Sequence, residues 1–178
     1  MSIIEIPSTI ESAPEASQPL LKAVNAQLGS VPNLFRIAAK SPKFLEGYLG
    51  LNGALGGGAL SLQIREKIAL RVAELNGCSY CLAAHNYLGT NLAKLSEQDV
   101  LSARKGLSET SQESVALNFV STLVTAKGKV TEFDVTKVLE AGYSEEQLIE
   151  MVGNVALNIL TNYLNEALKT DIDFPVVD

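Results

Sequence analysis

The most reactive side chains of this sequence fall within eight consecutive positions. Cys78 and Cys81 are the only cysteines of the chain, and His85 is its only histidine. On a helix these positions are i, i+3 and i+7, which places the side chains within about 60° of one another on one face. Cys81 and His85 are four residues apart, so their side chains are neighbours. The spacing predicts a thiol redox centre with a nucleophile, a resolving thiol and a base.

The order in which the two thiols react is open. Cys78 follows Gly77, which interrupts the preceding helical pattern, so Cys78 is expected in the first turn of a helix. Unpaired N–H groups and the helix dipole favour a thiolate there. Attack by Cys81, the neighbour of His85, with Cys78 as the resolving thiol, is the favoured order. Attack by Cys78, the usual exposed nucleophile of a Cys-x-x-Cys pair, is the alternative.

Other kinds of site fit this cluster less well. Buried cysteines and a lone histidine are often core residues. Here, however, both cysteines and the only histidine of the chain share one helix face, which unrelated core residues seldom do. A structural zinc site needs four ligands, whereas a catalytic zinc with two sulfurs, one nitrogen and an open position stays as an alternative. Leu82 after Cys81 excludes a haem-attachment motif. The sequence therefore favours a thiol site over a metal site or a haem-attachment site.

Composition narrows the class of protein. The 178 residues are 47% hydrophobic and 19% charged, which excludes a disordered chain. The net charge of −6, with no basic run, argues against nucleic acid or an anionic membrane as a partner. The first residues lack the basic and apolar regions of a signal peptide, and no apolar run approaches the roughly 20 residues of a spanning helix. The sequence predicts a soluble, cytoplasmic protein.

The elements that must position the cysteines are helices. Helical patterns follow one another along the chain and no stretch alternates like a strand, so the predicted fold is all-α. Residues 1–16 are expected to form an N-terminal arm, and residues 17–178 a single helical domain. From caps and helix breakers, helices are predicted at 17–29, 31–42, 42–55, 62–76, 78–95, 97–106, 112–128, 132–142 and 145–168. Ser61, Ser96, Ser111, Thr131 and Ser144 are the predicted N-terminal caps.

The segment "LSLQIREKIALRVAELNGCSYCLAAH" resembles the signature of the AhpD-like alkyl hydroperoxidase branch of the carboxymuconolactone decarboxylase family. That signature is Arg-Glu on one helix, followed about twelve residues later by Cys-x-x-Cys-x-x-x-His. Here it falls on Arg65, Glu66, Cys78, Cys81 and His85. The flanks "VPNLFRIAAKSP" and "AGYSEEQLIEMVGNVALNILTNYLN" are similar to peroxidase-related members, so the resemblance covers roughly residues 30–175. It implies an all-α, AhpD-like helix bundle assembled as trimers or hexamers, with no cofactor needed for peroxidase chemistry.

The sequence departs from the best-known members at Tyr80, where they carry a histidine. A phenol with a pKa near 10 is a poor base at neutral pH, so the proton relay is expected to depend on His85 and Glu66. Glu74 competes with Glu66 for the role of carboxylate, because an unbroken helix would place Glu74 four residues before Cys78. The helix break before Cys78 and the family spacing favour Glu66.

The function implied by the resemblance is a thiol-dependent peroxidase. Cys81 would attack a small peroxide, Cys78 would close a disulfide with it, and an external dithiol, a thioredoxin-like or lipoyl protein, would reduce the pair. Supporting roles are expected for Tyr80, Glu74 and Arg65. Three alternatives stay open: a disulfide oxidoreductase or redox adaptor, a decarboxylase-like enzyme using His85 and Glu66 for proton transfer, and a non-enzymatic oligomeric binding protein.

Overall fold

A computed structural model describes residues 2–175 of the chain. Within this range the only regular elements are helices, so the predicted all-α fold is confirmed. A 3₁₀ turn, η1 (Glu15–Ser17), precedes the α-helices. These are α1 (Gln18–Leu28), α2 (Asn33–Ala38), α3 (Pro42–Gly56), α4 (Leu62–Asn76), α5 (Ser79–Asn91), α6 (Glu97–Arg104), α7 (Ser111–Thr125), α8 (Glu132–Glu140) and α9 (Glu145–Leu168). No helix in the described range has the length and apolarity to cross a bilayer.

Side-chain caps start most of these helices where the sequence predicts. Ser96, Thr131 and Ser144 each form a reciprocal capping box with the third residue of the following helix. The prediction was wrong for α7, whose cap is Thr110 rather than Ser111. The Thr110 hydroxyl accepts from the backbone N–H of Glu113, so the helix begins one residue earlier.

Helix α5 is also shorter than predicted. It ends at Asn91 and not near residue 95, because Lys94 adopts a left-handed conformation with φ of 59°. The chain then turns back, and the backbone N–H of Leu95 donates to the carbonyl of Gly89. This turn buries the side chain of Leu95 in the core.

Helix α4 lies at the centre of the larger hydrophobic cluster. It packs against α5, α6, α7 and α9. Ile68, Leu70 and Val72 of α4 are fully buried, and Leu117 of α7 and Met151 of α9 belong to the same cluster. Four neighbouring helices thus hold the helix that carries Glu66, one of the predicted site residues.

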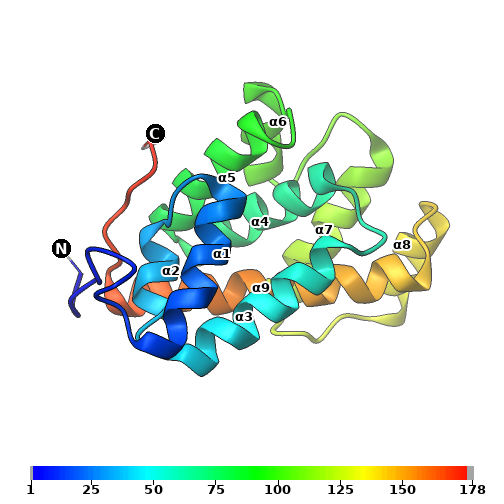
Figure 1. The fold of residues 1–178 in the computed structure, drawn as a ribbon. Helices are drawn as coiled ribbons and strands as arrows, with labels where there is room; N and C mark the ends of the chain where they lie inside the picture. The colour runs from blue at the N-terminus through cyan, green and yellow to red at the C-terminus, as the bar shows by residue number, and fades with distance from the viewer. Residues whose placement is uncertain (1, 176–178) are drawn as a thin grey trace.

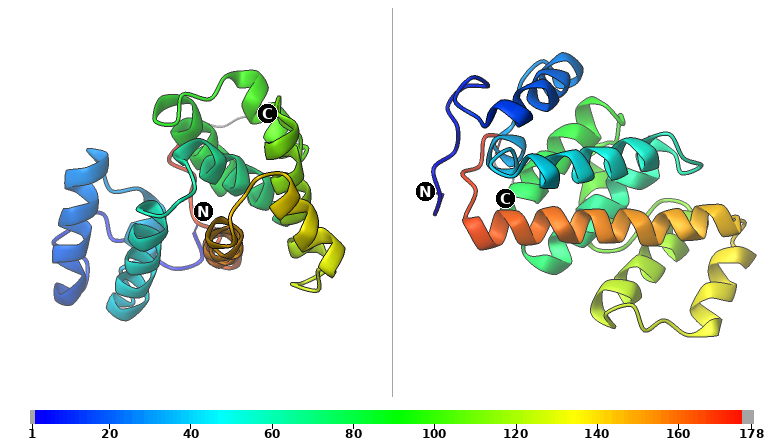
Figure 2. Two further views of the ribbon diagram at one scale, coloured as in Figure 1. Left: turned by 90° about the vertical axis from the view of Figure 1, so that its right-hand side faces the viewer. Right: turned by 60° about the horizontal axis from the view of Figure 1, so that its bottom comes forward.

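A second hydrophobic cluster joins α1, α2 and α3 around Leu21 and Leu45. Figure 2 shows α1 and α3 on one side of α9, and α4 to α7 on the other. A third, smaller cluster contains Leu34 of α2 together with Cys78 and Cys81. The two cysteines therefore lie where the two groups of helices meet.

The N-terminal segment lies beside the chain that leaves the C-terminal end of α9 (Figure 1). The backbone N–H of Ile3 donates to the carbonyl of Leu168 over 2.8 Å, and the hydroxyl of Ser2 donates to Asp171. The predicted N-terminal arm is thus not helical before Glu15, but it is bound to the C-terminal segment. The predicted division into an arm and one domain stays a prediction.

Candidate active site

Glu66 of α4 and His85 of α5 are brought together across two helices. Gly77 adopts a left-handed conformation with φ of 66°, which ends α4 and lets the chain turn into α5. The Glu66 Oε2 atom lies 2.8 Å from His85 Nδ1, in hydrogen-bonding and ion-pairing distance. A carboxylate in this position orients the imidazole and favours its protonated form.

Cys78 is the N-cap of α5, one position before the first turn in which the sequence placed it. Its backbone is extended, with φ of −87° and ψ of 96°, and its sulfur accepts from the N–H of Cys81 over 3.4 Å. The left-handed residue before it turns the chain, so Cys78 caps the helix instead of joining it. Its sulfur therefore lies over the start of α5, next to Cys81.

Helix α9 supplies polar contacts to Cys81. The Asn165 Nδ2 atom donates to the sulfur of Cys81 over 3.3 Å. The side-chain oxygen of Asn162 accepts from Asn76 over 2.8 Å, which orients the Asn162 amide. Its Nδ2 atom is buried without a hydrogen bond in the described structure, yet Asn162 also favours the thiolate of Cys81.

The two thiols are driven to opposite protonation states. The hydrogen bond from the Cys78 thiol lowers the pKa of Cys81 to about 6 against the effect of burial, with further help from the charge of His85 and the two asparagine amides. The same hydrogen bond, together with burial, raises the pKa of Cys78 far above its ordinary value. This arrangement favours a thiolate on Cys81 over one on Cys78. Which thiol reacts first stays a prediction.

The charges of His85 and Cys81 act on each other. Burial lowers the pKa of His85, but the charge and hydrogen bond of Glu66, together with the charge of Cys81, outweigh burial and raise it. A thiolate next to an imidazolium combines a nucleophile with a proton donor. Cys81 is only 2% exposed and Cys78 is fully buried, so a substrate reaches either sulfur only when the side chains that cover it move.

The predicted supporting residues have other partners. The Tyr80 hydroxyl accepts from the N–H of Leu34 and donates to Asp173 over 2.9 Å, which ties the C-terminal segment to α5. Burial raises the pKa of Tyr80, so this phenol stays neutral. Glu74 accepts from Arg104 over 2.7 Å. In the described structure Tyr80 and Glu74 thus bond to groups other than His85, and their supporting roles stay a prediction.

Arg65 points toward the end of α3. Its Nη1 atom is 3.4 Å from the position that a Cβ at Gly56 would take. Its Nε atom is buried without a hydrogen-bond partner in the described range. The structure thus places this arginine beside Gly56 and shows no hydrogen bond from it to Glu66 or His85.

Sequence reasoning missed Asn162 and Asn165, although a signal was present. Asn154, Asn158, Asn162 and Asn165 recur at helical spacing along α9 and are all buried. Asparagine is seldom placed on the buried face of a helix without a polar partner. Such a row in an otherwise apolar helix marks a face that contacts polar groups, here the sulfur of Cys81. Tyr48 of α3 was also missed, and no feature of its sequence neighbourhood distinguishes it.

No group of three or more His, Cys, Asp or Glu side chains in residues 2–175 is arranged to hold a metal ion. The two sulfurs and the imidazole therefore do not form the zinc site kept as an alternative. In place of a shared metal, His85 faces Glu66, and Cys81 faces Cys78 and Asn165.

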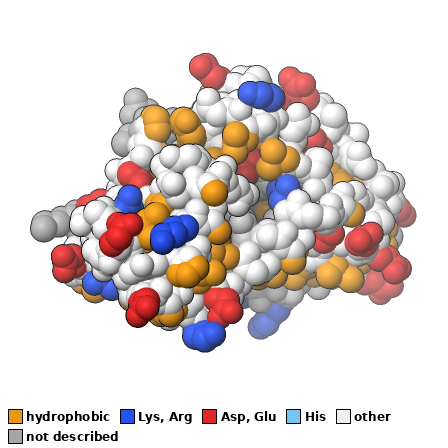
Figure 3. Space-filling view, in the orientation of Figure 1, with side chains coloured by type: hydrophobic (Ala, Val, Ile, Leu, Met, Phe, Trp, Pro, Cys, Tyr) orange, Lys and Arg blue, Asp and Glu red, His pale blue; other side chains and the backbone are white. Residues whose placement is uncertain are grey.

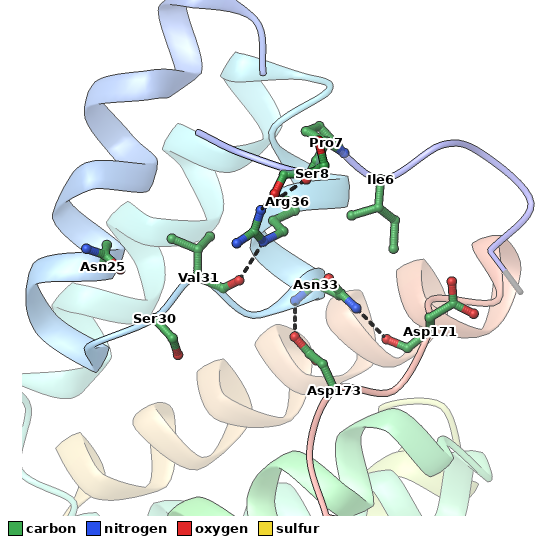
Figure 4. Close-up of a pocket in the computed structure, with 10 residues that line it drawn as sticks. All are labelled: Ile6, Pro7, Ser8, Asn25, Ser30, Val31, Asn33, Arg36, Asp171 and Asp173. Carbon is green, nitrogen blue, oxygen red and sulfur yellow. Dashed lines mark hydrogen bonds between the residues drawn. The ribbon is translucent and has the colours of Figure 1, made fainter. Parts of the chain in front are cut away.

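The larger of two described cavities is not at the cysteines. It has a volume of about 550 Å³ and lies between the N-terminal segment, the α1–α2 connection and the C-terminal segment (Figure 4). The guanidinium of Arg36 is bonded to the carbonyls of Val31, Pro7 and Ser8 in its wall. A cavity of about 250 Å³ adjoins the start of α5, where Ser79, Tyr80 and Asn165 line it.

Comparisons with known proteins support the resemblance. Residues 42–104, which include all five residues of the signature, match the carboxymuconolactone decarboxylase family. The resemblance predicted from the sequence is thereby confirmed. The chain matches no curated protein at a significant level.

Solved structures share the fold. An uncharacterized peroxidase-related protein from Silicibacter sp. TM1040 is 22% identical, with a TM-score of 0.83 over 96% of this chain and 91% of that one. An AhpD-core, peroxidase-related protein from Ralstonia eutropha JMP134 is 21% identical, with a TM-score of 0.86 over 97% and 92%. The debrominase Bmp8, in complex with 2,3,4-tribromopyrrole, is 21% identical, with a TM-score of 0.80 over 97% and 94%. The AhpD-like helical fold is thus shown.

Proposed function

We propose that this protein is a thiol-dependent peroxidase in which Cys81 attacks the peroxide and Cys78 resolves the product. The observation that carries the proposal is the different surroundings of the two sulfurs: the Asn165 amide donates to that of Cys81, whereas that of Cys78 caps α5. The pKa of Cys81 is lowered and that of Cys78 is raised accordingly. The thiolate is the form that attacks peroxides, so rate follows ionisation as well as access. The pairing of Glu66 with His85 supplies a proton donor beside that thiolate.

The reaction balances with these residues and one external reductant. The Cys81 thiolate attacks the terminal oxygen of ROOH, the O–O bond breaks, and RO⁻ takes the proton of the His85 imidazolium to leave as ROH. Cys81 is then a sulfenic acid. The neutral imidazole takes the proton of Cys78, whose sulfur attacks that of Cys81, and the departing hydroxide leaves as water with this proton. A dithiol, such as a thioredoxin-like or lipoyl protein of a reducing cytoplasm, restores both thiols by exchange.

Stopped-flow oxidation by cumene hydroperoxide tests the proposal. Wild-type protein should react faster than free cysteine at the same pH, and mass spectrometry should find a Cys78–Cys81 disulfide. Cys78→Ser should complete the first step and accumulate a sulfenic acid that dimedone labels, while Cys81→Ser should show no first step. Label on Cys78 in Cys81→Ser at the wild-type rate would reverse the assignment of the two thiols.

The same measurements separate the rival functions. A redox adaptor would exchange disulfides with a dithiol but react with peroxide no faster than free cysteine. A decarboxylase-like enzyme would keep its activity in the Cys78→Ser/Cys81→Ser double variant, because His85 and Glu66 alone would transfer the proton. A binding protein would lose no activity when both thiols are alkylated.

Reductive dehalogenation is a second candidate, favoured by the likeness in fold to Bmp8 in complex with 2,3,4-tribromopyrrole. Two thiols and an aryl bromide would yield a disulfide, the debrominated ring and HBr, so the same pair of cysteines balances the reaction. Bromide release from 2,3,4-tribromopyrrole in the presence of dithiothreitol measures it. Release that requires Cys81, together with peroxide reactivity no greater than that of free cysteine, would replace the peroxidase proposal.

A further inference from the structure

Tyr48 of α3 packs against the hydrophobic cluster that contains the two cysteines, although α3 carries none of the predicted site residues. Its half-buried side chain packs against both the cluster around Leu45 and the cluster that contains Cys78 and Cys81. Its ring centroid is 5.8 Å from that of Phe35 in α2, and this contact steadies the ring. Tyr48 thus forms part of the surface that faces the two thiols.

The hydroxyl of Tyr48 has no hydrogen bond to any described residue. The hydroxyl of Tyr80, the other tyrosine in contact with this cluster, makes two. Because the Tyr48 side chain is only half-buried, water can reach its hydroxyl in the free protein. A substrate oxygen can take the place of that water without breaking a bond within the chain.

The surroundings keep this hydroxyl protonated. Burial raises the pKa of Tyr48, and the charges of Cys81 and Glu66 raise it further. The hydroxyl is thus close enough to feel both members of the site. Across the working pH range it can donate a hydrogen bond.

We propose that the Tyr48 hydroxyl contacts the peroxide and donates a hydrogen bond to the oxygen that leaves when Cys81 attacks. This rests on the proposed peroxidase function and adds a residue that touches the substrate. Negative charge develops on the leaving oxygen as the O–O bond breaks, and a preorganised donor in a site shielded from water stabilises that charge. Tyr48 from α3 and His85 from α5 would then both act on the same oxygen, one as donor and one as acid.

The test compares two reactions of the same thiol in Tyr48→Phe. Oxidation by cumene hydroperoxide should slow about tenfold, the loss expected for one hydrogen bond made in the transition state. Alkylation by iodoacetamide, which has no peroxide oxygen to stabilise, should stay within about twofold of wild type. Incorporation of 3,5-difluorotyrosine at position 48 restores a donor of nearly the same shape and should restore the oxidation rate.

Tyr143→Phe is the matched control, because Tyr143 is buried in the hydrophobic cluster around α4 and not in the cluster that contains the cysteines. It should leave the peroxide rate of the folded protein near that of wild type. Equal oxidation rates in wild type and Tyr48→Phe would overturn the role of Tyr48 alone, as would an equal loss in alkylation. A wild-type protein no faster than free cysteine would instead remove the peroxidase proposal and this inference with it.

Discussion

Cys78 and Cys81 have the same side chain but different surroundings, because Cys78 caps α5 and Cys81 lies inside the helix. The Cys78 thiol keeps its proton. The sulfur of Cys81 accepts hydrogen bonds from the Cys78 thiol and the Asn165 amide and is near the positive charge of His85. Each of these groups stabilises a thiolate on Cys81. The proposed division between nucleophile and resolving thiol therefore depends on the groups that surround each sulfur, one of which comes from α9.

The first prediction concerns the ionisation of Cys81. Alkylation of wild-type protein should follow a pH midpoint near 6, because the pKa of Cys81 is about 6 and the thiolate is present above that pH. His85→Gln removes a positive charge and should move the midpoint upward, so that reactivity at pH 6 falls and returns at higher pH. Thiolate absorbance at 240 nm, read alongside the alkylation rate, measures both.

A matched pair at position 78 checks the largest cause of that shift. Cys78→Ala removes the hydrogen-bond donor and should raise the midpoint, whereas Cys78→Ser keeps a hydroxyl donor and should raise it less. Equal midpoints in Cys78→Ala and wild type would show that the Cys78 thiol does not tune Cys81.

At the scale of elements, a loop and a helix are joined by one carboxylate. Glu150 of α9 accepts from the N–H groups of Ala59 and Leu60 over 2.8 and 2.9 Å and so holds the loop between α3 and α4. A Cβ at Gly58 would collide with this carboxylate, whereas one at Gly57 would meet only an ordinary contact at 3.8 Å. The glycine at 58 is thus required by close approach.

The second prediction follows from that contact. Gly58→Ala should lower the free energy of unfolding by about 2 kcal/mol, because the displaced carboxylate loses two charge-assisted hydrogen bonds. Gly57→Ala should change it little. Urea denaturation measures both variants. The double variant with Glu150→Ala should cost less than the sum of the single changes, and strict additivity would rule out the shared contact.

Lys67 is a buried cation that ties α4 to α6 and α7. It is 5% exposed, and its Nζ lies 2.8 Å from Glu113 and 3.5 Å from Asp99. Burial raises the pKa of Glu113, but hydrogen bonds from Lys67 and Ser108 outweigh it and lower the pKa overall. Hydrogen bonds from the α6 cap lower the pKa of Asp99, with a smaller effect of Lys67.

The third prediction is that Lys67→Met lowers the free energy of unfolding by about 1–3 kcal/mol at neutral pH, since two carboxylates lose their cation. A carboxylate with a lowered pKa stabilises the fold above its unfolded pKa, and this stabilisation is lost as pH falls through the folded pKa. Denaturation of wild type between pH 7 and 3 should show that loss, and Lys67→Met should show less of it. Lys43→Met, which removes an exposed pair with Glu46, should change neither quantity.

At the scale of the whole molecule, the described chain leaves apolar surface uncovered. Ile149 and Tyr163 of α9 are 71% and 64% exposed, and Leu51 of α3 is 42% exposed. Figure 3 shows apolar side chains gathered over the middle of the face on which α3 and α5 lie. The space beside the glycines of α3 at 47, 50 and 53 is open, so another helix can approach closely there. Large apolar side chains exposed in this way favour self-association.

The fourth prediction is that the protein forms trimers or hexamers. Light scattering at micromolar concentration should give three or six times the chain mass of 19.0 kDa. Ile149→Arg with Tyr163→Arg should shift the mass toward 19.0 kDa if α9 forms the interface, whereas Phe133→Ser, on the exposed face of α8, serves as the surface control. A single species of 19.0 kDa in wild type would contradict the prediction.

The sequence by itself determined the fold class and where the chemistry is concentrated. Caps such as Ser96, Thr131 and Ser144 act within one helical turn, so they can be recognised without the rest of the chain. The side chains of Cys78, Cys81 and His85 likewise gather through short spacing along one element. The predicted helix ends were wrong at two places. Thr110 caps α7 in place of its neighbour Ser111, and α5 ends early because Lys94, a non-glycine residue, adopts a left-handed conformation.

Only the tertiary structure decided the partners of those side chains. The pairing of His85 with Glu66, the bonding of Tyr80 to Asp173 and the approach of Asn165 to Cys81 all join residues far apart in the chain. Spacing within a helix specifies a face, but the charge of a thiol depends on what packs against that face, because hydrogen bonds, burial and nearby charges act through space. That is why the assignment of the thiolate to Cys81 required the packing of α4 and α9 around α5.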